Sequence, residues 1–322
     1  MRIGKITENA LKRSVLKLLR TEYKDVKSAA VGSDCAFSSS KNAFSAVATV
    51  TADIADPGFY AVVKALTGLF SQGITPDHVT VSVMLPADAE EKTVKDIVKG
   101  AIAASKLCDV QYCGGHTEVT GAVSRALVTA CAVAGRTESS LATSKPVAGD
   151  DLVVTKWIAL EGTAMLASEK MEELSARYPI PFIEEAQRFK ELLDIRAEAA
   201  VAVESSVTAI HDVSSGGIYA CLWEMSEKAG CGLEVDLRKI PVRQETIEIC
   251  EFFEVNPYQL TSGGALLIAT SDGEGLVRKL EQEGIPAAVI GSLKEGNDKI
   301  IVNGDEKRYL ESPQADEIHK VL

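Results

Sequence analysis

The sequence predicts an α+β fold of two domains, and three observations support this. A chain of 322 residues is long enough for two domains that each bury a core. Strand-like and helix-like segments alternate through its first part, as they do in layered structures of strands and helices. Residues 137–151 are rich in Ser, Thr, Gly and Pro, which is typical of a linker. We therefore expect an N-terminal domain over residues 1–145 and a C-terminal domain over residues 146–322.

Hydrophobic spacing and caps predict the elements of the N-terminal domain. Residues 8–19 carry Leu and Val at helical spacing and predict a short amphipathic helix. Asp56 and Pro57 predict the start of a helix that ends near Gly73, because Asp caps a helix and Pro fits its first position. A further helix is expected over residues 93–107. Alternating apolar residues predict strands over residues 43–51, 78–85 and 126–133.

The same patterns predict the elements of the C-terminal domain. Strands are expected over residues 152–155, 233–237, 265–268, 287–290 and 299–302. Helices are expected over residues 164–170, 183–203, 218–228 and 274–282. Thr163 precedes the first of these helices and is expected to cap it, with a role as a phosphate ligand as the alternative. The chain is expected to end in a polar tail.

A glycine-rich polar stretch lies between two segments with regular patterns. Gly114 and Gly115 would let the backbone approach a ligand or turn sharply. His116, Thr117 and Glu118 would then place an imidazole, a hydroxyl and a carboxylate at the edge of a sheet. The alternative is a plain polar turn with a solvated histidine and glutamate.

Three aspartates lie next to expected strands or helices. Asp34 lies on the way into a strand and Asp53 follows another, and carboxylates so placed suit a hard cation such as Mg²⁺. Asp212 leads into the pair Gly216 and Gly217 at the expected start of a helix, where backbone N–H groups can bind an anion. Each aspartate could equally be a cap, and the glycine pair could serve close packing of the helix on a strand.

The composition of the chain and the motifs that it lacks argue against several classes of protein. With a net charge of -12 and only 5% aromatic residues, nucleic acid is not an expected partner, although a single nucleotide could still bind through Mg²⁺ and backbone amides. Seven cysteines without a C-x-x-C spacing indicate reduced thiols in the cytoplasm and no zinc site. No stretch approaches the ~20 apolar residues of a membrane span. The P-loop, Rossmann, zinc-protease and serine-hydrolase signatures are missing.

Several of these stretches, taken in order, resemble the superfamily of aminoimidazole ribonucleotide (AIR) synthase. This PurM-like superfamily includes the hydrogenase maturation factor HypE, thiamine-monophosphate kinase and selenophosphate synthetase. The resemblance covers nearly the whole chain and is nearest to HypE and AIR synthase-related proteins. The stretches that carry it are residues 32–36, 51–53, 73–76, 114–117, 160–164, 209–217 and 262–264.

The resemblance implies a fold and a function. It implies an N-terminal domain whose sheet pairs with that of a second subunit to close a β-barrel, and a C-terminal α/β sandwich domain. ATP would lie between the domains, held through Mg²⁺ and aspartates, and would phosphorylate or activate an oxygen of a small amide- or carboxyl-type substrate. The expected partners are a second copy of the chain, the small-molecule substrate and a maturation partner protein.

The resemblance also assigns candidate residues. The metal ligands would be Asp34, Asp53 and Glu118. The ATP and phosphate site would comprise Asp34, Gly114, Gly115, Thr117, Asp212, Gly216 and Gly217. The catalytic residue stays open, with Asp53, His116 and Asp212 as candidates. In loose phosphoryl transfer the protein mainly positions groups and offsets charge, so no activated nucleophile is required.

The chain departs from the family pattern in three places. Gly68 stands where the family has a metal-binding aspartate, and His116 replaces another carboxylate, so Mg²⁺ should bind more weakly. The C-terminal cysteine of HypE is missing, and the last cysteine is Cys250. A nucleotide-binding or scaffold homologue without catalysis is therefore the alternative to an enzyme. A third hypothesis is a soft-metal site of Cys113, His116 and Glu118.

Overall fold

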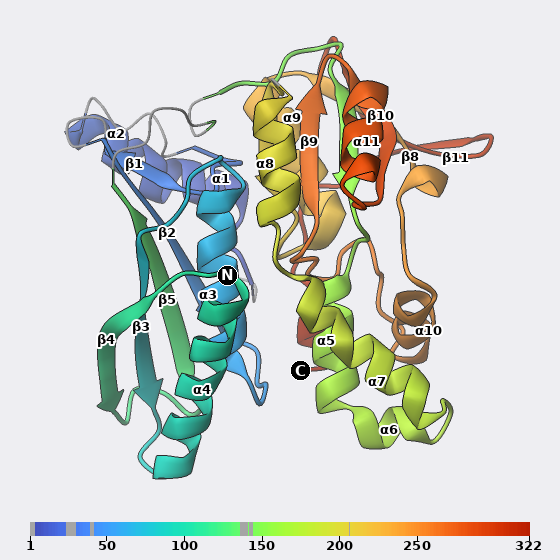
Figure 1. Cartoon of the computed structure of the whole chain (residues 1–322). Coiled ribbons are helices and arrows are strands. Elements are labelled where there is room, and N and C mark those ends of the chain that lie inside the picture. The colour runs from blue at the N-terminus through green and yellow to red at the C-terminus, as the bar shows by residue number, and fades with distance from the viewer. Residues whose placement is uncertain (1–3, 24–29, 39–41, 136–140, 142–143, 206) are drawn as a thin grey trace.

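The structure of the chain, a computed structural model, describes residues 4–23, 30–38, 42–135, 141, 144–205 and 207–322. It shows two lobes side by side, each built on its own sheet (Figure 1). The two-domain α+β fold is thus confirmed, and both sheets are mixed. Part of the expected linker, residues 137–140, 142 and 143, lies outside the described residues. No helix in the described ranges is long and apolar enough to cross a membrane.

The N-terminal sheet has five strands in the order β1-β2-β5-β3-β4. They are β1 (Ala36–Ser38), β2 (Ala43–Val50), β3 (His78–Leu85), β4 (Tyr112–Val119) and β5 (Leu127–Ala134). Neighbours are antiparallel, except that β3 and β4 are parallel. The three strands expected in this domain are confirmed to within one residue at each end.

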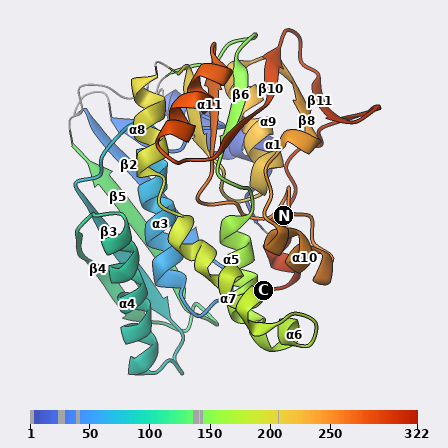
Figure 2. The same ribbon diagram turned by 45° about the vertical axis from the view of Figure 1, so that its right-hand side comes forward.

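Helices cover one face of this sheet. α3 (Pro57–Phe70) begins at the predicted cap, where the Asp56 carboxylate accepts the N–H of Phe59 at 3.3 Å. α3 and α4 (Glu91–Leu107) lie on the same side, and both views place α3 between the sheet and the C-terminal lobe (Figure 1, Figure 2). The N-terminal helix is also confirmed, in three successive segments. These are α1 (Glu8–Leu11), the π-helical η1 (Lys12–Leu16) and α2 (Lys17–Glu22).

The expected position of the Gly114 stretch at the edge of a sheet is confirmed, but the polar turn does not form, because the stretch is itself the edge strand β4. At Gly115 a Cβ would lie 1.8 Å from the carbonyl oxygen of Val81, so the glycine is needed for close pairing with β3. Every residue of β4 after Tyr112 is exposed. Because neither face of the strand is buried, its sequence lacks the apolar alternation that identifies strands.

Replacing Gly115 tests this explanation. Gly115→Ala is expected to lower the free energy of unfolding by about 2–4 kcal/mol, because the new Cβ collides with Val81 and the φ of 156° is strained for alanine. Urea denaturation measures the loss. Gly114→Ala is the matched control, since a Cβ there has no neighbour within 4 Å and adds only backbone strain. Equal losses in the two variants would contradict the steric explanation.

The C-terminal sheet has seven strands in the order β12-β11-β8-β10-β6-β9-β7, and only β8 and β11 are parallel neighbours. The strands are β6 (Asp151–Thr155), β7 (Ala209–Asp212), β8 (Gly232–Asp236), β9 (Leu266–Thr270), β10 (Ala287–Lys294), β11 (Lys299–Asn303) and β12 (Glu306–Tyr309). The α-helices are α5 (Leu160–Glu169), α6 (Met171–Ser175), α7 (Ile180–Arg188), α8 (Arg196–Glu204), α9 (Gly217–Ala229), α10 (Gln244–Phe252) and α11 (Gly273–Gln282). Short 3₁₀ helices are η2 (Phe189–Leu192), η3 (Leu237–Lys239) and η4 (Glu317–Lys320).

Three expectations for this domain are wrong. The single helix over residues 183–203 is two helices, because the buried Lys156 binds the carbonyls of Leu192 and Asp194 that a continuous helix would use. Thr163 lies inside α5 rather than before it, and its hydroxyl bonds to that of Thr246 at 2.9 Å. The polar tail is partly structured, since it ends in η4 with buried side chains.

Candidate functional site

Asp34 is a buried carboxylate at the interface of the two domains. Its side chain is 2% exposed and accepts hydrogen bonds from Ser71 Oγ at 2.9 Å and Gln72 Nε2 at 2.7 Å, just beyond α3. The backbone N–H of Asp212, at the end of β7, donates to the same carboxylate oxygen at 3.2 Å. The aspartate that was expected near a cation therefore links both domains.

His211 lies between carboxylates on both sides of its ring. Its Nδ1 contacts Asp34 and lies 3.5 Å from Asp212 Oδ1, while its Nε2 lies 2.9 Å from Glu224 Oε2 on α9. Within the described ranges, Asp34, His211 and Asp212 form the one group of three acidic, histidine or cysteine side chains close enough to share a metal ion, with ligand atoms within 4.8 Å. We call these three residues the interdomain cluster.

Burial and neighbouring charges set the protonation of this cluster. Burial raises the pKa of Asp34, and the charge of His211 only partly opposes it. For His211, burial disfavours the imidazolium, but the charge of Asp34 and other contacts outweigh it and raise the pKa well above its usual value. Burial would raise the pKa of Asp212, yet its contacts with His211 lower it. Against its burial, Lys5 and His211 lower the pKa of Glu224 to about 2.

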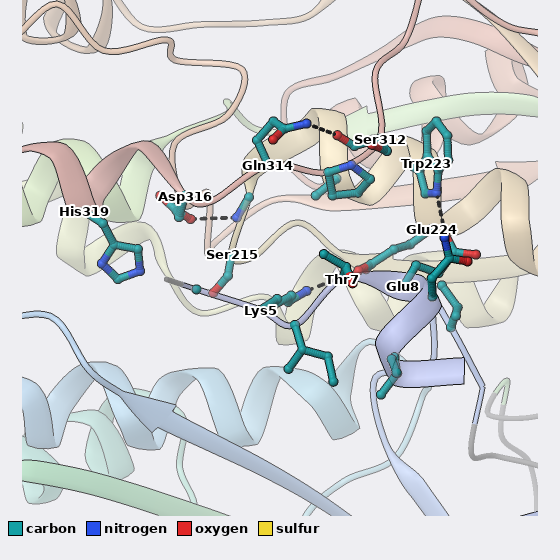
Figure 3. A pocket seen from close by; sticks show the side chains of 18 of the residues that line it. Lys5, Thr7, Glu8, Ser215, Trp223, Glu224, Ser312, Gln314, Asp316 and His319 are labelled. Carbon is teal, nitrogen blue, oxygen red and sulfur yellow. Dashed lines mark hydrogen bonds and ion pairs between the residues drawn. The ribbon is translucent and has the colours of Figure 1, made fainter. Parts of the chain in front are cut away.

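A cavity of about 1030 Å³ (Figure 3) is connected to the cluster through Glu224, although Asp34, His211 and Asp212 do not line it. The N-terminal segment, the start of α9 and the C-terminal segment form its walls. Glu224 belongs both to the cavity wall and to the contacts of His211, and it pairs with Lys5 at 3.3 Å. The cavity is large enough for a nucleotide, since ligand pockets usually measure about 300–1,000 Å³.

The anion site expected at Gly216 and Gly217 is already filled by a carboxylate of the chain. Asp316 accepts the N–H of Gly216 at 2.6 Å and that of Thr261 at 3.1 Å (Figure 3 draws the first bond). The N–H of Gly217 donates to the carbonyl of Ser214 at 3.0 Å. A phosphate could bind these N–H groups only after Asp316 moves, which is a correction to the expected free cradle.

The other candidate residues lie apart from the cluster in the single chain. Asp53 is 74% exposed and lies 3.9 Å from Arg125. His116 and Glu118 pair at 3.0 Å on the exposed face of β4, the opposite edge of the sheet from β1. Gly114, Gly115 and Thr117 lie on the same strand. The expected metal trio of Asp34, Asp53 and Glu118 is therefore not assembled within one chain, where His211 and Asp212 accompany Asp34 instead.

The soft-metal hypothesis has no support in the single chain. Among the described residues, Cys113, His116 and Glu118 do not form a group with ligand atoms close enough for one ion. The pairing of β3 with β4 skips Cys113 at a bulge. The thiol is therefore not aligned with the His116 and Glu118 pair by a regular strand.

These features define a class of two-domain proteins that have an acidic cluster and a nucleotide-sized cavity between their domains. The chain belongs to the AIR synthase related protein family. Residues 14–137 match the N-terminal domain of that family and residues 147–303 match its C-terminal domain. The family expectation is confirmed.

Individual relatives agree with this assignment. The chain is 24% identical to the putative hydrogenase expression/formation protein MJ0676 of Methanocaldococcus jannaschii, over 83% of this chain and 79% of the relative. It is also 24% identical to the carbamoyl dehydratase HypE of Rhodobacter capsulatus, over 73% and 69%. Its fold resembles HypE in a HypE-HypF complex (TM-score 0.76, 18% identity, 93% of this chain and 100% of that one). It also resembles HypE in complex with ATP (TM-score 0.68, 16% identity, 86% of both chains).

The departure at Gly68 has a steric reason. A Cβ at this position on α3 would lie 2.9 Å from both the Cβ of Ala46 and the carbonyl oxygen of Asp34. A carboxylate side chain therefore has no room there. The other two side chains of the cluster, His211 and Asp212, lie on β7.

Proposed function

We propose that this protein is an ATP-dependent enzyme of the AIR synthase family. It uses ATP to phosphorylate or activate an oxygen of a small amide- or carboxyl-type substrate, as in HypE-like hydrogenase maturation. The observation that carries the proposal is the interdomain cluster, which Glu224 connects to the 1030 Å³ cavity. The ATP held by a HypE of the same fold supports the nucleotide.

The residues of the cluster fit a divalent cation. Asp34 and Asp212 offer carboxylate oxygens, the ligands that Mg²⁺ prefers. A bound cation would offset the charge that develops on the phosphates during transfer. Lys5 and Ser215 lie on the cavity wall, where an ammonium and a hydroxyl can bind phosphate oxygens. Asp316 would leave the Gly216 N–H when a phosphate takes its place.

Calorimetric titration with ATP, with and without Mg²⁺, tests the proposal. We expect binding that requires Mg²⁺, followed by ADP formation with a substrate found among amides, carboxylates and ribonucleotides. Absence of ATP binding under both conditions would overturn it.

We also propose a homodimer in which two N-terminal sheets close a β-barrel. The outer edge of β4 has no strand beside it within the described chain, and the sheet face opposite α3 exposes Val47, which is 66% exposed on β2. The roles proposed for Asp53, His116, Thr117 and Glu118 depend on this second subunit. Seven free cysteines support a reducing, cytoplasmic location, and the HypE-HypF complex supports a maturation partner protein.

A charged substitution on the face of the N-terminal sheet opposite α3 tests the proposed homodimer. Val47→Glu is expected to convert the protein to a monomer, because it places a carboxylate in an apolar interface, while the circular dichroism spectrum stays unchanged. Light scattering after size-exclusion chromatography measures the mass. Ile102→Glu is the control, since Ile102 is 40% exposed on α4, outside the sheet. A Val47→Glu variant that stays dimeric would contradict this interface.

The alternative is a nucleotide-binding or scaffold homologue that has no catalytic activity. The ion pairs that His211 makes with Asp34 and Glu224 and the bond of Asp316 to the Gly216 N–H both favour a binding or scaffold role. Phosphorylated product from any candidate substrate would exclude this alternative.

A further inference from the structure

A second cavity, of about 560 Å³, lies at the C-terminal end of α4. Its walls come from residues 76 and 77, from the last two turns of α4 and from residues 109–112, which lead into β4. All of these residues belong to the N-terminal domain, and none of them lines the 1030 Å³ cavity. The second cavity is therefore separate from the proposed nucleotide site.

Ser105 brings an unused hydroxyl to this cavity. It is the only buried polar residue of the lining, at 5% exposed. In the part of the chain that the structure describes, its Oγ is one of three buried side-chain N or O atoms that make no hydrogen bond. A helical serine can bond to the carbonyl one turn earlier, as Ser168 does to Ala164 at 2.8 Å, but Ser105 does not. A buried hydroxyl without a partner is unfavourable, so a polar group of a bound molecule would stabilise it.

The charged groups of the lining favour a cation. Asp77 and Asp109 contribute two carboxylates, and Lys106 is the one basic residue among the lining residues. The N–H of Gly135 donates to Asp77 Oδ2 at 2.7 Å and so fixes that carboxylate. The C-terminal end of a helix carries a partial negative charge, which adds to the two carboxylates. An anion would be repelled here, whereas a cation would be attracted.

The lining suits an organic cation better than a metal ion. Within the described ranges, Asp77 and Asp109 belong to no group of three acidic, histidine or cysteine side chains close enough to share an ion. The walls also include the apolar side chains of Pro76 and Ile102 and the ring of Tyr112. Apolar side chains would contact an alkyl chain, and an aromatic ring attracts an ammonium group.

Asp109 keeps a carboxylate at a position that favours glycine. It follows the C-terminal end of α4 with a φ of 51°, and the N–H of Val110 bonds to the carbonyl of Ser105 at 2.9 Å. Glycine is the usual residue at such a left-handed helix end, because a side chain is strained there. A charged side chain retained at this position agrees with a binding role.

We propose that this cavity binds a small alkylammonium ion. Its N–H groups would donate to the carboxylates of Asp77 and Asp109 and to Ser105 Oγ, and its alkyl chain would lie on Ile102 and Pro76. The site is independent of the proposed function, because it shares no residue with the interdomain cluster. The same ammonium chemistry occurs on free amines and on the lysine side chains of proteins.

Calorimetric titration without ATP compares three compounds and separates these two sources. They are 1,4-diaminobutane, Nα-acetyl-lysine amide, and 1,4-butanediol, which has the length of the diamine and no charge. We expect an ammonium compound to bind and the diol not to bind. Tighter binding of the diamine would assign a free amine, and tighter binding of the lysine amide would assign a lysine side chain. Binding of neither ammonium compound, or equally tight binding of the diol, would overturn the proposal.

Two variants are expected to weaken binding while they stabilise the protein. Ser105→Ala removes the unpaired hydroxyl and Asp109→Gly relieves the left-handed backbone, so both should raise the melting temperature. Each should weaken ammonium binding about 10–100-fold, because a hydrogen bond to a charged group is lost. Asp96→Asn is the control, since it removes the same charge from α4 outside the cavity. Wild-type affinity in both variants, or an equal loss in Asp96→Asn, would overturn the proposal.

Nuclear magnetic resonance of the wild-type protein locates the ligand if the variants do not fold. Nuclear Overhauser contacts are expected between the methylene protons of the bound amine and the methyl groups of Ile102, which lines the cavity and is 40% exposed. A bound amine without contacts to Ile102 or Tyr112 would lie elsewhere and would refute this site.

Discussion

Lys64→Met is expected to destabilise the protein by about 3–5 kcal/mol, because it leaves a buried charge without its partner. Lys64 Nζ, on α3, lies 2.8 Å from both carboxylate oxygens of Glu161 on α5. Glu161 is 1% exposed, and Thr261 and the N–H of Gly263 also bind it. These two hydrogen bonds do not neutralise the carboxylate, so a large loss should remain after the ammonium is removed.

Urea denaturation of the single and double variants measures the coupling free energy between Lys64 and Glu161. Glu161→Gln keeps an oxygen acceptor without the charge, so Lys64→Met combined with Glu161→Gln should recover part of the stability. Lys95→Met is the matched control, because Lys95 and Glu91 form an exposed pair at 2.7 Å that contributes only about 0.5 kcal/mol. If Lys64→Met costs no more than Lys95→Met, the buried pair does not hold the domains together.

Local patterns predicted the elements that have one buried face. β3 alternates buried and less buried residues along its whole length, and α3 has a cap and a proline at its start. The sequence does not reveal β4 because this strand has no buried face. It does not reveal the break between α7 and α8 because the break depends on Lys156, which follows β6 and donates to the carbonyls of Leu192 and Asp194. In both cases the decisive contact is distant in sequence, so no local period records it.

Sequence motifs indicated some residues of the candidate site, whereas others can be recognised only from their contacts in the fold. Asp34 and Asp212 stood out as carboxylates beside glycines and strands, and the fold brings them together across 178 residues of chain. His211 was visible next to Asp212, but its role appears only with Asp34 and Glu224 around it. Asp316 was missed because a polar tail gives no sign that its carboxylate fills the anion site at Gly216.

Asp212→Asn is expected to reduce kcat for ATP turnover about 10²–10³-fold, because in the proposed site it removes a charge that would hold the cation against the phosphates. The fold should survive, since the substitution keeps the backbone N–H of Asp212 that donates to Asp34. The side chain lies 3.5 Å from His211 Nδ1 and is the most exposed of the three in the cluster, at 14%. Steady-state turnover over a range of Mg²⁺ concentrations measures the effect, and wild-type turnover in the variant would remove Asp212 from the site.

Asp53→Asn distinguishes a metal site formed by the interdomain cluster of one chain from a site that a second subunit completes with Asp53. Asp53 is 74% exposed and lies outside the interdomain cluster, so a site formed within one chain predicts unchanged turnover in this variant. A loss equal to that of Asp212→Asn would mean instead that a second subunit brings Asp53 to the phosphates. Combining Asp53→Asn with the monomeric Val47→Glu variant decides between these cases, because only a site shared between subunits would lose its dependence on Asp53 when the dimer is broken.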